Sequence, residues 1–177
     1  VTSGYFVWVN GTYAGYDQGG YTPAEFDVTE HVHPGANTVA VQVHRWSAGS
    51  YLEDYDQWRY SGIFRSVWAY STPQARVQDV YVTTDLDSAY RDAVLNATVT
   101  LARGDGPAGP YTVTGTLVDP RGRPVQRLTG RAELSGGSAS VRLSAPVRDP
   151  AKWTDETPDL YTLVLTLTDP AGRTGHI

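Results

Sequence analysis

The chain contains no cysteine and no methionine among its 177 residues. The lack of cysteine excludes a disulfide framework, a thiolate zinc site and a cysteine nucleophile, so apolar burial must hold the fold together. Because methionine is missing even at position 1, we expect Val1 to be an excised or processed end of a longer protein. No basic and apolar leader precedes the first predicted strand, and we therefore expect a cytoplasmic protein.

Basic residues are also scarce. The chain has 14 Lys plus Arg against 19 Asp plus Glu, which gives a formal net charge of −5. Nucleic-acid binding requires a concentrated basic surface, so this class of partner is excluded. No apolar run approaches the roughly 20 residues of a membrane-spanning helix. We expect partners that are neither nucleic acid nor membrane.

Alternating apolar and polar residues dominate the chain, and no segment of helical length carries an apolar stripe at three- and four-residue spacing. This pattern predicts an all-β fold. In the first part of the chain we expect strands at residues 5–9, 37–45 and 63–70, with Asn10-Gly11 closing a tight hairpin. The segment 45–65 is then a long loop carried by the last two of these strands, where binding groups tend to lie.

The composition changes after residue 70, where aromatic residues give way to Thr, Val and Leu. With Ser71-Thr-Pro73 as a linker, we expect one domain over residues 1–72 and a second over 73–177. Six strands are predicted in the second domain, at residues 77–83, 93–102, 111–118, 125–134, 138–143 and 160–168. Their spacing indicates an immunoglobulin-like β-sandwich without a disulfide. Asp-Pro-x-Gly-Arg occurs at 119–123 and again at 169–173, and the second copy predicts a seventh strand from Thr174.

The segment RWSAGSYLEDYDQWRYSGIFR at 45–65 breaks the alternation with charges, aromatics and glycines, which marks it as a candidate site. Glu53, Asp54 and Asp56 place three carboxylates within four residues. Neighbouring carboxyl groups of this kind can form an acid and base pair. The alternative is that they are solvated or paired with arginine, as grouped surface carboxylates usually are.

Three blocks in this order closely resemble the β-galactosidases of glycoside hydrolase family 2: VWVNGTYAG at 7–15, TPAEFD at 22–27, and the segment 45–65. The resemblance implies a partial jelly-roll (galactose-binding-like) sandwich over residues 1–72, followed by the immunoglobulin-like sandwich. It also implies that the family's catalytic (β/α)₈ barrel lies outside this chain. On this basis we expect no catalytic residue here, and a parent enzyme that hydrolyses terminal β-D-galactosides with retention.

By its place in the motif, Asp56 resembles a family aspartate that contacts galactosyl hydroxyls and a sodium ion; magnesium is a further cation implied for the parent enzyme. A carboxylate suits both roles, because it accepts hydroxyl hydrogen bonds and is a hard oxygen ligand. The alternative is an ion pair of Asp56 with Arg59 or Arg65 that only shapes the loop. The family pattern Glu-Asp-Gln-Asp-x-Trp departs here at Tyr55.

We expect the charged and aromatic neighbours Glu53, Trp58, Arg59 and Arg65 to shape the loop rather than bind sugar. The aromatic residues Trp46, Tyr51, Tyr55, Trp58 and Tyr60 either form a stacking platform for pyranose rings or are buried at an interface. In the parent enzyme we expect Trp58 to pack against the barrel. His31 and His33 form at most half of a metal site, because no third ligand lies nearby in sequence.

Two other function classes compete with this hypothesis. One is a free-standing carbohydrate-binding module, in which the aromatic residues supply the affinity. The other is an oligomer-assembly piece that self-associates, because a partial β-domain leaves strand edges unpaired.

Overall fold

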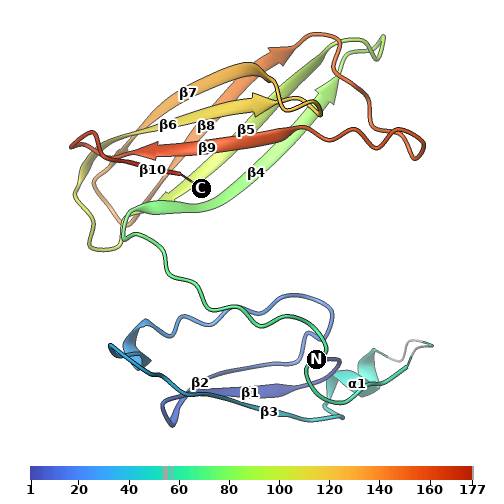
Figure 1. Ribbon diagram of the computed structural model, residues 1–177, viewed down its shortest axis with the longest axis vertical. Helices are drawn as coiled ribbons and strands as arrows, with labels where there is room; N and C mark the ends of the chain where they lie inside the picture. Colours follow the sequence, from blue (N-terminus) through green and yellow to red (C-terminus); the bar gives the residue numbers. More distant parts are fainter. Residues whose placement is uncertain (54–55, 57, 177) are drawn as a thin grey trace. The chain divides into compact units, whose positions relative to one another are not determined.

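A computed structural model describes residues 1–53, 56 and 58–176 (Figure 1). The chain divides into two compact units, Val1–Tyr70 and Ser71–Ile177. The division expected from the sequence lies two residues later, after residue 72. None of the helices in the described part of the chain has the length and apolar character needed to traverse a bilayer.

The first unit is built on a three-stranded antiparallel sheet in the order β2-β1-β3. Its strands are β1 (Tyr5–Val9), β2 (Thr12–Asp17) and β3 (Val39–Val43); the one-turn helix η1 (Thr29–His31) lies between β2 and β3, and α1 (Gly49–Leu52) follows β3. Asn10 and Gly11 link β1 to β2 with φ angles of 50° and 80°. Positive φ at both central residues is the geometry of the tight hairpin that the Asn-Gly pair predicts.

The side chain of Asn10 also fixes the way β3 approaches the hairpin. Its Nδ2 donates to the carbonyl oxygen of His31 at 2.8 Å and to Oδ1 of Asn37 at 2.7 Å, while its Oδ1 accepts from the backbone N–H of Thr38 at 2.9 Å. The side-chain amide of Asn10 therefore makes hydrogen bonds at both ends of the segment that leads from η1 into β3.

One face of this sheet is covered and the other is open. Val7 and Val9 are buried, and Tyr5 on the same face meets Phe26 edge-on with ring centroids 6.3 Å apart. A Cβ atom at Gly15 would overlap the ring of Phe26, so only glycine allows this ring to lie against β2. The covered face forms the small core of the first unit.

The expected strand at 63–70 is wrong. The structure has no strand there, and none of the described strands pairs with this segment. Val67 and Trp68 are exposed. Apolar and β-branched residues favour a strand only where a neighbouring strand supplies hydrogen bonds and packing, and these residues have neither. The segment 45–65 therefore follows a strand, β3, but does not lead into a second one.

The second unit is an antiparallel β-sandwich of two sheets, seen one over the other in Figure 1. The first sheet has the order β4-β5-β8, formed by Arg76–Leu86, Ala93–Ala102 and Ser138–Val147. The second has the order β10-β9-β6-β7, formed by Thr174–His176, Thr162–Thr168, Gly109–Val118 and Pro124–Leu134. This confirms the predicted strands, including the seventh. The arrangement is immunoglobulin-like and does not use a disulfide.

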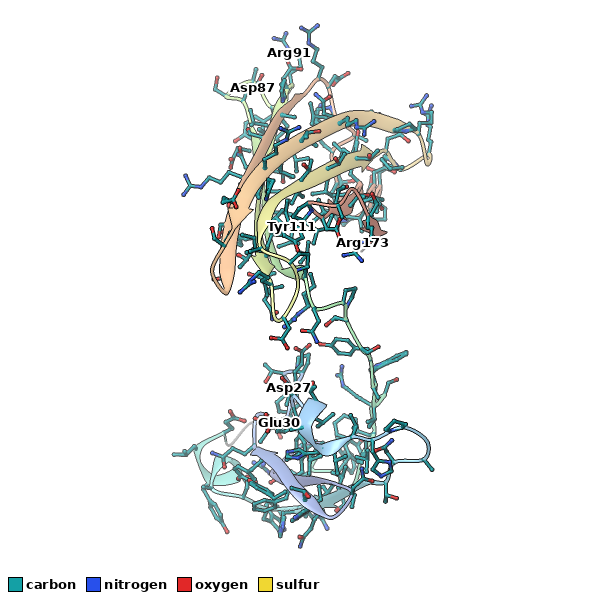
Figure 2. The ribbon with its side chains drawn as sticks, turned by 90° about the vertical axis from the view of Figure 1, so that its left-hand side faces the viewer. Asp27, Glu30, Asp87, Arg91, Tyr111 and Arg173 are labelled. Carbon is teal, nitrogen blue, oxygen red and sulfur yellow. The ribbon has the colours of Figure 1, made fainter. Side chains whose placement is uncertain are left out.

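Alternate residues of these strands meet between the sheets. Fourteen buried residues form the core: Leu95, Ala97, Val99, Leu101, Tyr111, Val113, Leu117, Leu128, Leu134, Val141, Leu143, Ala145, Leu165 and Leu167. Tyr111 is the largest fully buried side chain, and its hydroxyl donates to the carbonyl oxygen of Pro107 at 2.8 Å (labelled in Figure 2). Burial raises the pKa of this hydroxyl.

Polar side chains close the ends of the sandwich. Tyr161 immediately precedes β9, and its hydroxyl oxygen accepts the backbone N–H of Ala151 at 3.0 Å, an arrangement similar to the tyrosine corner of immunoglobulin-like domains. β9 begins at Thr162 rather than at residue 160 as expected, because its partner β6 ends at Val118, which lies opposite Thr162.

The two Asp-Pro-x-Gly-Arg segments form the same turn. Asp119 accepts the backbone N–H of Arg123 at 2.9 Å and the Nε–H of the same residue at 2.8 Å, and Asp169 repeats both contacts with Arg173 at 2.8 Å and 2.7 Å. The backbone hydrogen bond from Arg123, followed by the hydrogen bond from its side chain, lowers the pKa of Asp119. The same kind of backbone hydrogen bond lowers the pKa of Asp169.

Candidate functional site

The segment that follows β3 is fixed at its base by buried hydroxyl groups. In α1, the Oγ atom of Ser50 lies 3.3 Å from the Oγ atom of Ser3 and accepts the backbone N–H of Ser47 at 3.1 Å. Ser3 and Ser50 are both buried. These contacts join the start of the loop to the residues that lead into β1.

Two arginines and a tryptophan hold the next part of the loop. The guanidinium carbons of Arg45 and Arg59 lie 5.6 Å and 5.5 Å from the ring centroid of Trp46. Arg45 Nη2 donates to the carbonyl oxygen of Arg59 at 3.5 Å, and Arg59 Nη2 donates to the carbonyl oxygen of Glu53 at 3.2 Å. Arg59 therefore makes contacts on both sides of the segment that contains Asp56.

The other predicted loop-shaping residues have different surroundings. Glu53 takes part through its backbone carbonyl, and its side chain is exposed. The guanidinium of Arg65 lies 6.0 Å from the ring centroid of Phe64. Trp58 lies outside the cluster of Arg45, Trp46 and Arg59, with 81% of its surface exposed.

Asp56 is an exposed residue of the same loop. In the part of the chain that the structure describes, no ion pair joins it to Arg59 or Arg65. The other members of the predicted motif, Asp54 and Tyr55, lie outside the described residues. The carboxylate of Asp56 is therefore accessible to a ligand or to another part of a larger protein.

The loop and the segment after it expose an unusual amount of apolar surface. Ten large side chains between residues 46 and 70 are exposed: Trp46, Tyr51, Leu52, Trp58, Tyr60, Ile63, Phe64, Val67, Trp68 and Tyr70. Extended exposed apolar surface marks an interaction site more often than a solvated one. The exposed set includes Trp46, Tyr51, Trp58 and Tyr60 of the loop and continues beyond it to Trp68 and Tyr70.

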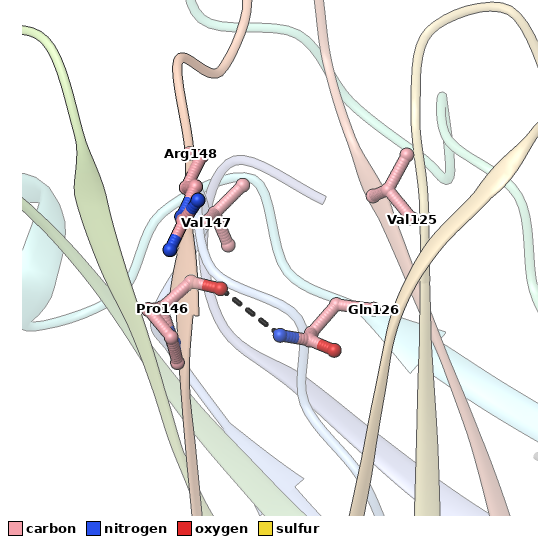
Figure 3. A pocket seen from close by; sticks show the side chains of 5 residues that line it. All are labelled: Val125, Gln126, Pro146, Val147 and Arg148. Carbon is pink, nitrogen blue, oxygen red and sulfur yellow. Dashed lines mark hydrogen bonds between the residues drawn. The ribbon is translucent and has the colours of Figure 1, made fainter.

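The two hollows that we describe lie in the second unit. One, of about 300 Å³, opens between β7 and β8, where Gln126 Nε2 donates to the carbonyl oxygen of Pro146 at 3.0 Å (Figure 3). The other, of about 600 Å³, lies beside the turn at Asp119 and also includes Lys152 and Tyr161. Neither hollow is lined by a predicted site residue.

Among the described residues, no three His, Asp or Glu side chains lie close enough together to form a metal site. His31 ends η1, while a ring nitrogen of His33 lies 3.1 Å from the carbonyl oxygen of Pro34. Asp56 provides one hard oxygen ligand, which is the ligand type that sodium and magnesium take.

Sequence reasoning missed an aromatic cluster on the open face of the first sheet. Phe6 lies against Trp8, Tyr13 and Tyr16 with ring centroids 6.0, 6.4 and 4.7 Å apart. The sequence does place aromatic residues at alternate positions 6 and 8 of one strand, and two more at positions 13 and 16 of the next strand. The two faces are distinguished only once the register of β1 and β2 is known.

Comparison with known proteins covers almost the whole chain. Residues 1–73 match the family described as "Glycosyl hydrolases family 2, sugar binding domain", and residues 75–176 match "Glycosyl hydrolases family 2". A Beta-galactosidase of Priestia megaterium is 41% identical over 174 residues, and one of Vibrio vulnificus is 43% identical over 179 residues. Each alignment covers 97% of this chain, which spans only 17% of the length of either relative.

Solved structures show the same fold. A Bacteroides uniformis beta-glucuronidase superposes with a TM-score of 0.85 and 24% identity, covering 99% of this chain and 22% of that one. A Parabacteroides merdae beta-glucuronidase gives a TM-score of 0.80 with 20% identity, covering 99% of this chain and 23% of that one.

Proposed function

The chain belongs to glycoside hydrolase family 2, and on that premise we propose that it is a non-catalytic part of a longer β-galactosidase. In this proposal it contributes a substrate-contacting loop to an active site whose reacting groups lie elsewhere in the parent protein. One observation carries the proposal: relatives named Beta-galactosidase align with 97% of this chain, which spans 17% of their length.

The structure of the loop supports the proposal that the loop contacts substrate while the reacting groups lie elsewhere in the parent protein. Retaining hydrolysis requires two carboxyl groups about 5–5.5 Å apart on either side of the glycosidic bond, within a site that accommodates the sugar. Neither of the two hollows described above is lined by residues of the loop, whereas Asp56 is exposed in a segment that also exposes many apolar side chains. This is the arrangement expected of a loop that completes a pocket formed by another part of the parent protein.

Asp56 is the residue that we propose to touch the substrate. An ionised carboxylate accepts hydrogen bonds from two neighbouring sugar hydroxyls, and hydrogen bonds to a charged group are stronger than those between neutral groups. The contacts of Arg59 with Trp46 and with the backbone of Glu53 restrict the loop on both sides of Asp56, which lowers the entropy lost on binding.

We also propose that Asp56 is a ligand of sodium in the parent protein. A carboxylate oxygen suits this hard cation. The remaining ligands would come from the parent protein or from the sugar, because the described residues do not bring three His, Asp or Glu side chains together.

The test is a substitution in the full-length protein that carries this segment. Asp56→Asn keeps the shape of the side chain but removes its charge. We expect kcat/KM for an aryl β-galactoside to fall about 10- to 100-fold, because one or two charge-assisted hydrogen bonds are lost from the transition state. The sodium concentration for half-maximal activity should rise as well.

Asp155→Asn is the matched control, since Asp155 is an exposed aspartate of the second unit. It should leave both kinetic quantities unchanged. Equal kinetics and equal sodium response for the Asp56 and Asp155 variants would remove Asp56 from the site. The purified 177-residue chain should not hydrolyse the substrate, and turnover by this chain that Asp56→Ala abolishes would overturn the proposal.

A further inference from the structure

The turn between β1 and β2 holds the only Asn-Gly pair of the sequence, Asn10-Gly11. The other two asparagines, Asn37 and Asn96, precede a threonine and an alanine. Asparagine is a thermolabile residue. A following glycine leaves its own backbone nitrogen free of a neighbouring side chain. Asn10-Gly11 is therefore the place in this chain where a side-chain amide is most open to attack by the backbone.

The reaction available to this pair is deamidation. The backbone nitrogen of Gly11 attacks the side-chain carbon Cγ of Asn10 and loses its proton, while the bond from Cγ to Nδ2 breaks and ammonia leaves. Water then opens the resulting cyclic imide at either carbonyl, which leaves aspartate or isoaspartate at position 10. Water can reach the turn, because no atom lies within 4 Å of a Cβ built at Gly11.

The side-chain amide of Asn10 is fully engaged in the folded chain. Its Nδ2 donates to the carbonyl oxygen of His31 and to Oδ1 of Asn37, which uses both of its N–H groups, and its Oδ1 accepts the backbone N–H of Thr38. Attack at Cγ makes this carbon tetrahedral and turns Nδ2 and Oδ1 in new directions. The reaction therefore requires that these three hydrogen bonds be released first.

The orientation of Asn37 prevents an aspartate product from fitting the same place. Oδ1 of Asn37 also accepts the backbone N–H of His33 at 3.0 Å, and its Nδ2 donates to the carbonyl oxygens of His33 and Gly35 at 2.7 Å and 3.1 Å. These contacts keep the oxygen of Asn37 directed at residue 10. An ionised carboxylate at position 10 accepts hydrogen bonds but donates none, so it would face two acceptors, this oxygen and the carbonyl oxygen of His31.

An isoaspartate product alters the turn itself. It routes the backbone through the former side chain and lengthens the turn by an additional backbone carbon. Asn10 and Gly11 have φ angles of 50° and 80°, the geometry with which a two-residue turn matches the twist of its strands. Both products therefore weaken the junction between the hairpin and the segment that leads into β3.

We propose that Asn10-Gly11 is a deamidation site that the fold of the first unit protects. Exposure does not decide the rate, since Asn10 is an exposed residue; the hydrogen bonds of its side chain do. The amide reacts when the segment 31–38 opens and releases it, and the product then opposes closure. Deamidation thus converts a reversible local opening into an irreversible one.

The first experiment compares the folded and unfolded chain. The 177-residue protein is incubated at mildly alkaline pH, which favours loss of the Gly11 N–H proton, with and without urea. Peptide mass spectrometry follows the replacement of NH₂ by OH at each asparagine. We expect Asn10 to react at least about tenfold more slowly in buffer than in urea, because only the opened population reacts. In urea, Asn10 should react faster than Asn37 and Asn96.

Asn37→Ala tests the hydrogen bonds without changing the reacting pair. It removes one acceptor of Asn10 Nδ2 and should raise the rate at Asn10 in buffer about 2- to 10-fold, as expected for the loss of one hydrogen bond. The rate in urea should not change. Asn96→Ala, the same substitution in the second unit, is the matched control and should leave the rate at Asn10 unaltered. The comparison of buffer with urea needs no variant, so it decides even if Asn37→Ala does not fold.

Asn10→Asp carries the aspartate product from synthesis. Hydrogen exchange of its β1 and β3 peptides should be faster than in the unaltered chain, while β5 should be unaffected. Three results would overturn the proposal. The first is an equal rate at Asn10 in buffer and in urea, and the second is a rate in folded Asn37→Ala equal to that of the unaltered chain. The third is full protection of β1 and β3 in Asn10→Asp.

Discussion

Replacing Gly130 with alanine tests the packing between the two sheets of the second unit. Gly130 lies on β7 opposite Val113 of β6, and an added Cβ atom would overlap Cγ1 of Val141 and lie 2.8 Å from Cδ2 of Leu143. Both of these side chains are buried on β8. The new methyl group has no free volume, so the core must shift to accept it.

The expected cost follows from two opposing effects. Overpacking a well-packed core costs about 1–3 kcal/mol. Alanine recovers about 0.4–1 kcal/mol, because it has less conformational freedom than glycine in the unfolded chain. The net loss in the free energy of unfolding should be about 1–2 kcal/mol, or a fall in Tm of about 4–16 °C for a unit of this size.

The assay is urea unfolding, with hydrogen exchange of peptides from β7 and β8 to restrict the measurement to the second unit. Gly136→Ala is the matched control, since Gly136 lies in the turn between the same strands, has no atom within 4 Å of an added Cβ and does not have a positive φ. Its stability should be unchanged or slightly higher. Equal stability of the two variants would refute the packing argument, as would a Gly130→Val variant no less stable than Gly130→Ala.

Three further predictions concern single polar contacts. Tyr111→Phe should lower the free energy of unfolding by about 1–2 kcal/mol, because the carbonyl of Pro107 loses its donor; an unchanged urea midpoint would contradict this. Because hydrogen bonds lower the folded-state pKa of Asp119 and Asp169, the stability they provide should be complete above about pH 4 and decline as the pH falls through the folded pKa. The difference in urea midpoint between the unaltered chain and Asp119→Asn should therefore become smaller as the pH falls. A difference that does not change with pH would contradict the proposed contribution of ionised Asp119 to stability. Arg59→Ala should speed hydrogen exchange of the backbone amides in the Asp56 loop without affecting β5 or β6, and unchanged loop exchange would show that Arg59 does not hold the loop.

Local sequence signals predicted the second unit well. Buried residues alternate with half-buried ones along β5 and β6, and a period of two in the sequence can be recognised without tertiary information. The Asp-Pro-x-Gly-Arg turns were predictable for the same reason. Each closes through hydrogen bonds within five consecutive residues, such as those between Asp119 and Arg123.

Signals of the same kind were misleading in the first unit. Residues 63–70 have the composition of a strand but no strand beside them, and β-propensity expresses packing against neighbours that the sequence does not specify. The helix α1 was not predicted either. Its four residues are too few for a periodic pattern, and the buried contact between Ser3 and Ser50 that fixes it joins residues far apart in sequence.

The sequence by itself determined the all-β architecture, the hairpin at Asn10-Gly11 and the family resemblance of the segment that contains Asp56. Each of these depends only on residues that are close together in the sequence. Only the tertiary structure decided which groups meet: the guanidinium groups of Arg45 and Arg59 near Trp46, and the rings gathered on the open face of the first sheet. Contacts of this kind depend on strand register and chain path. A shift of one residue in register would turn Phe6 and Trp8 to the other face.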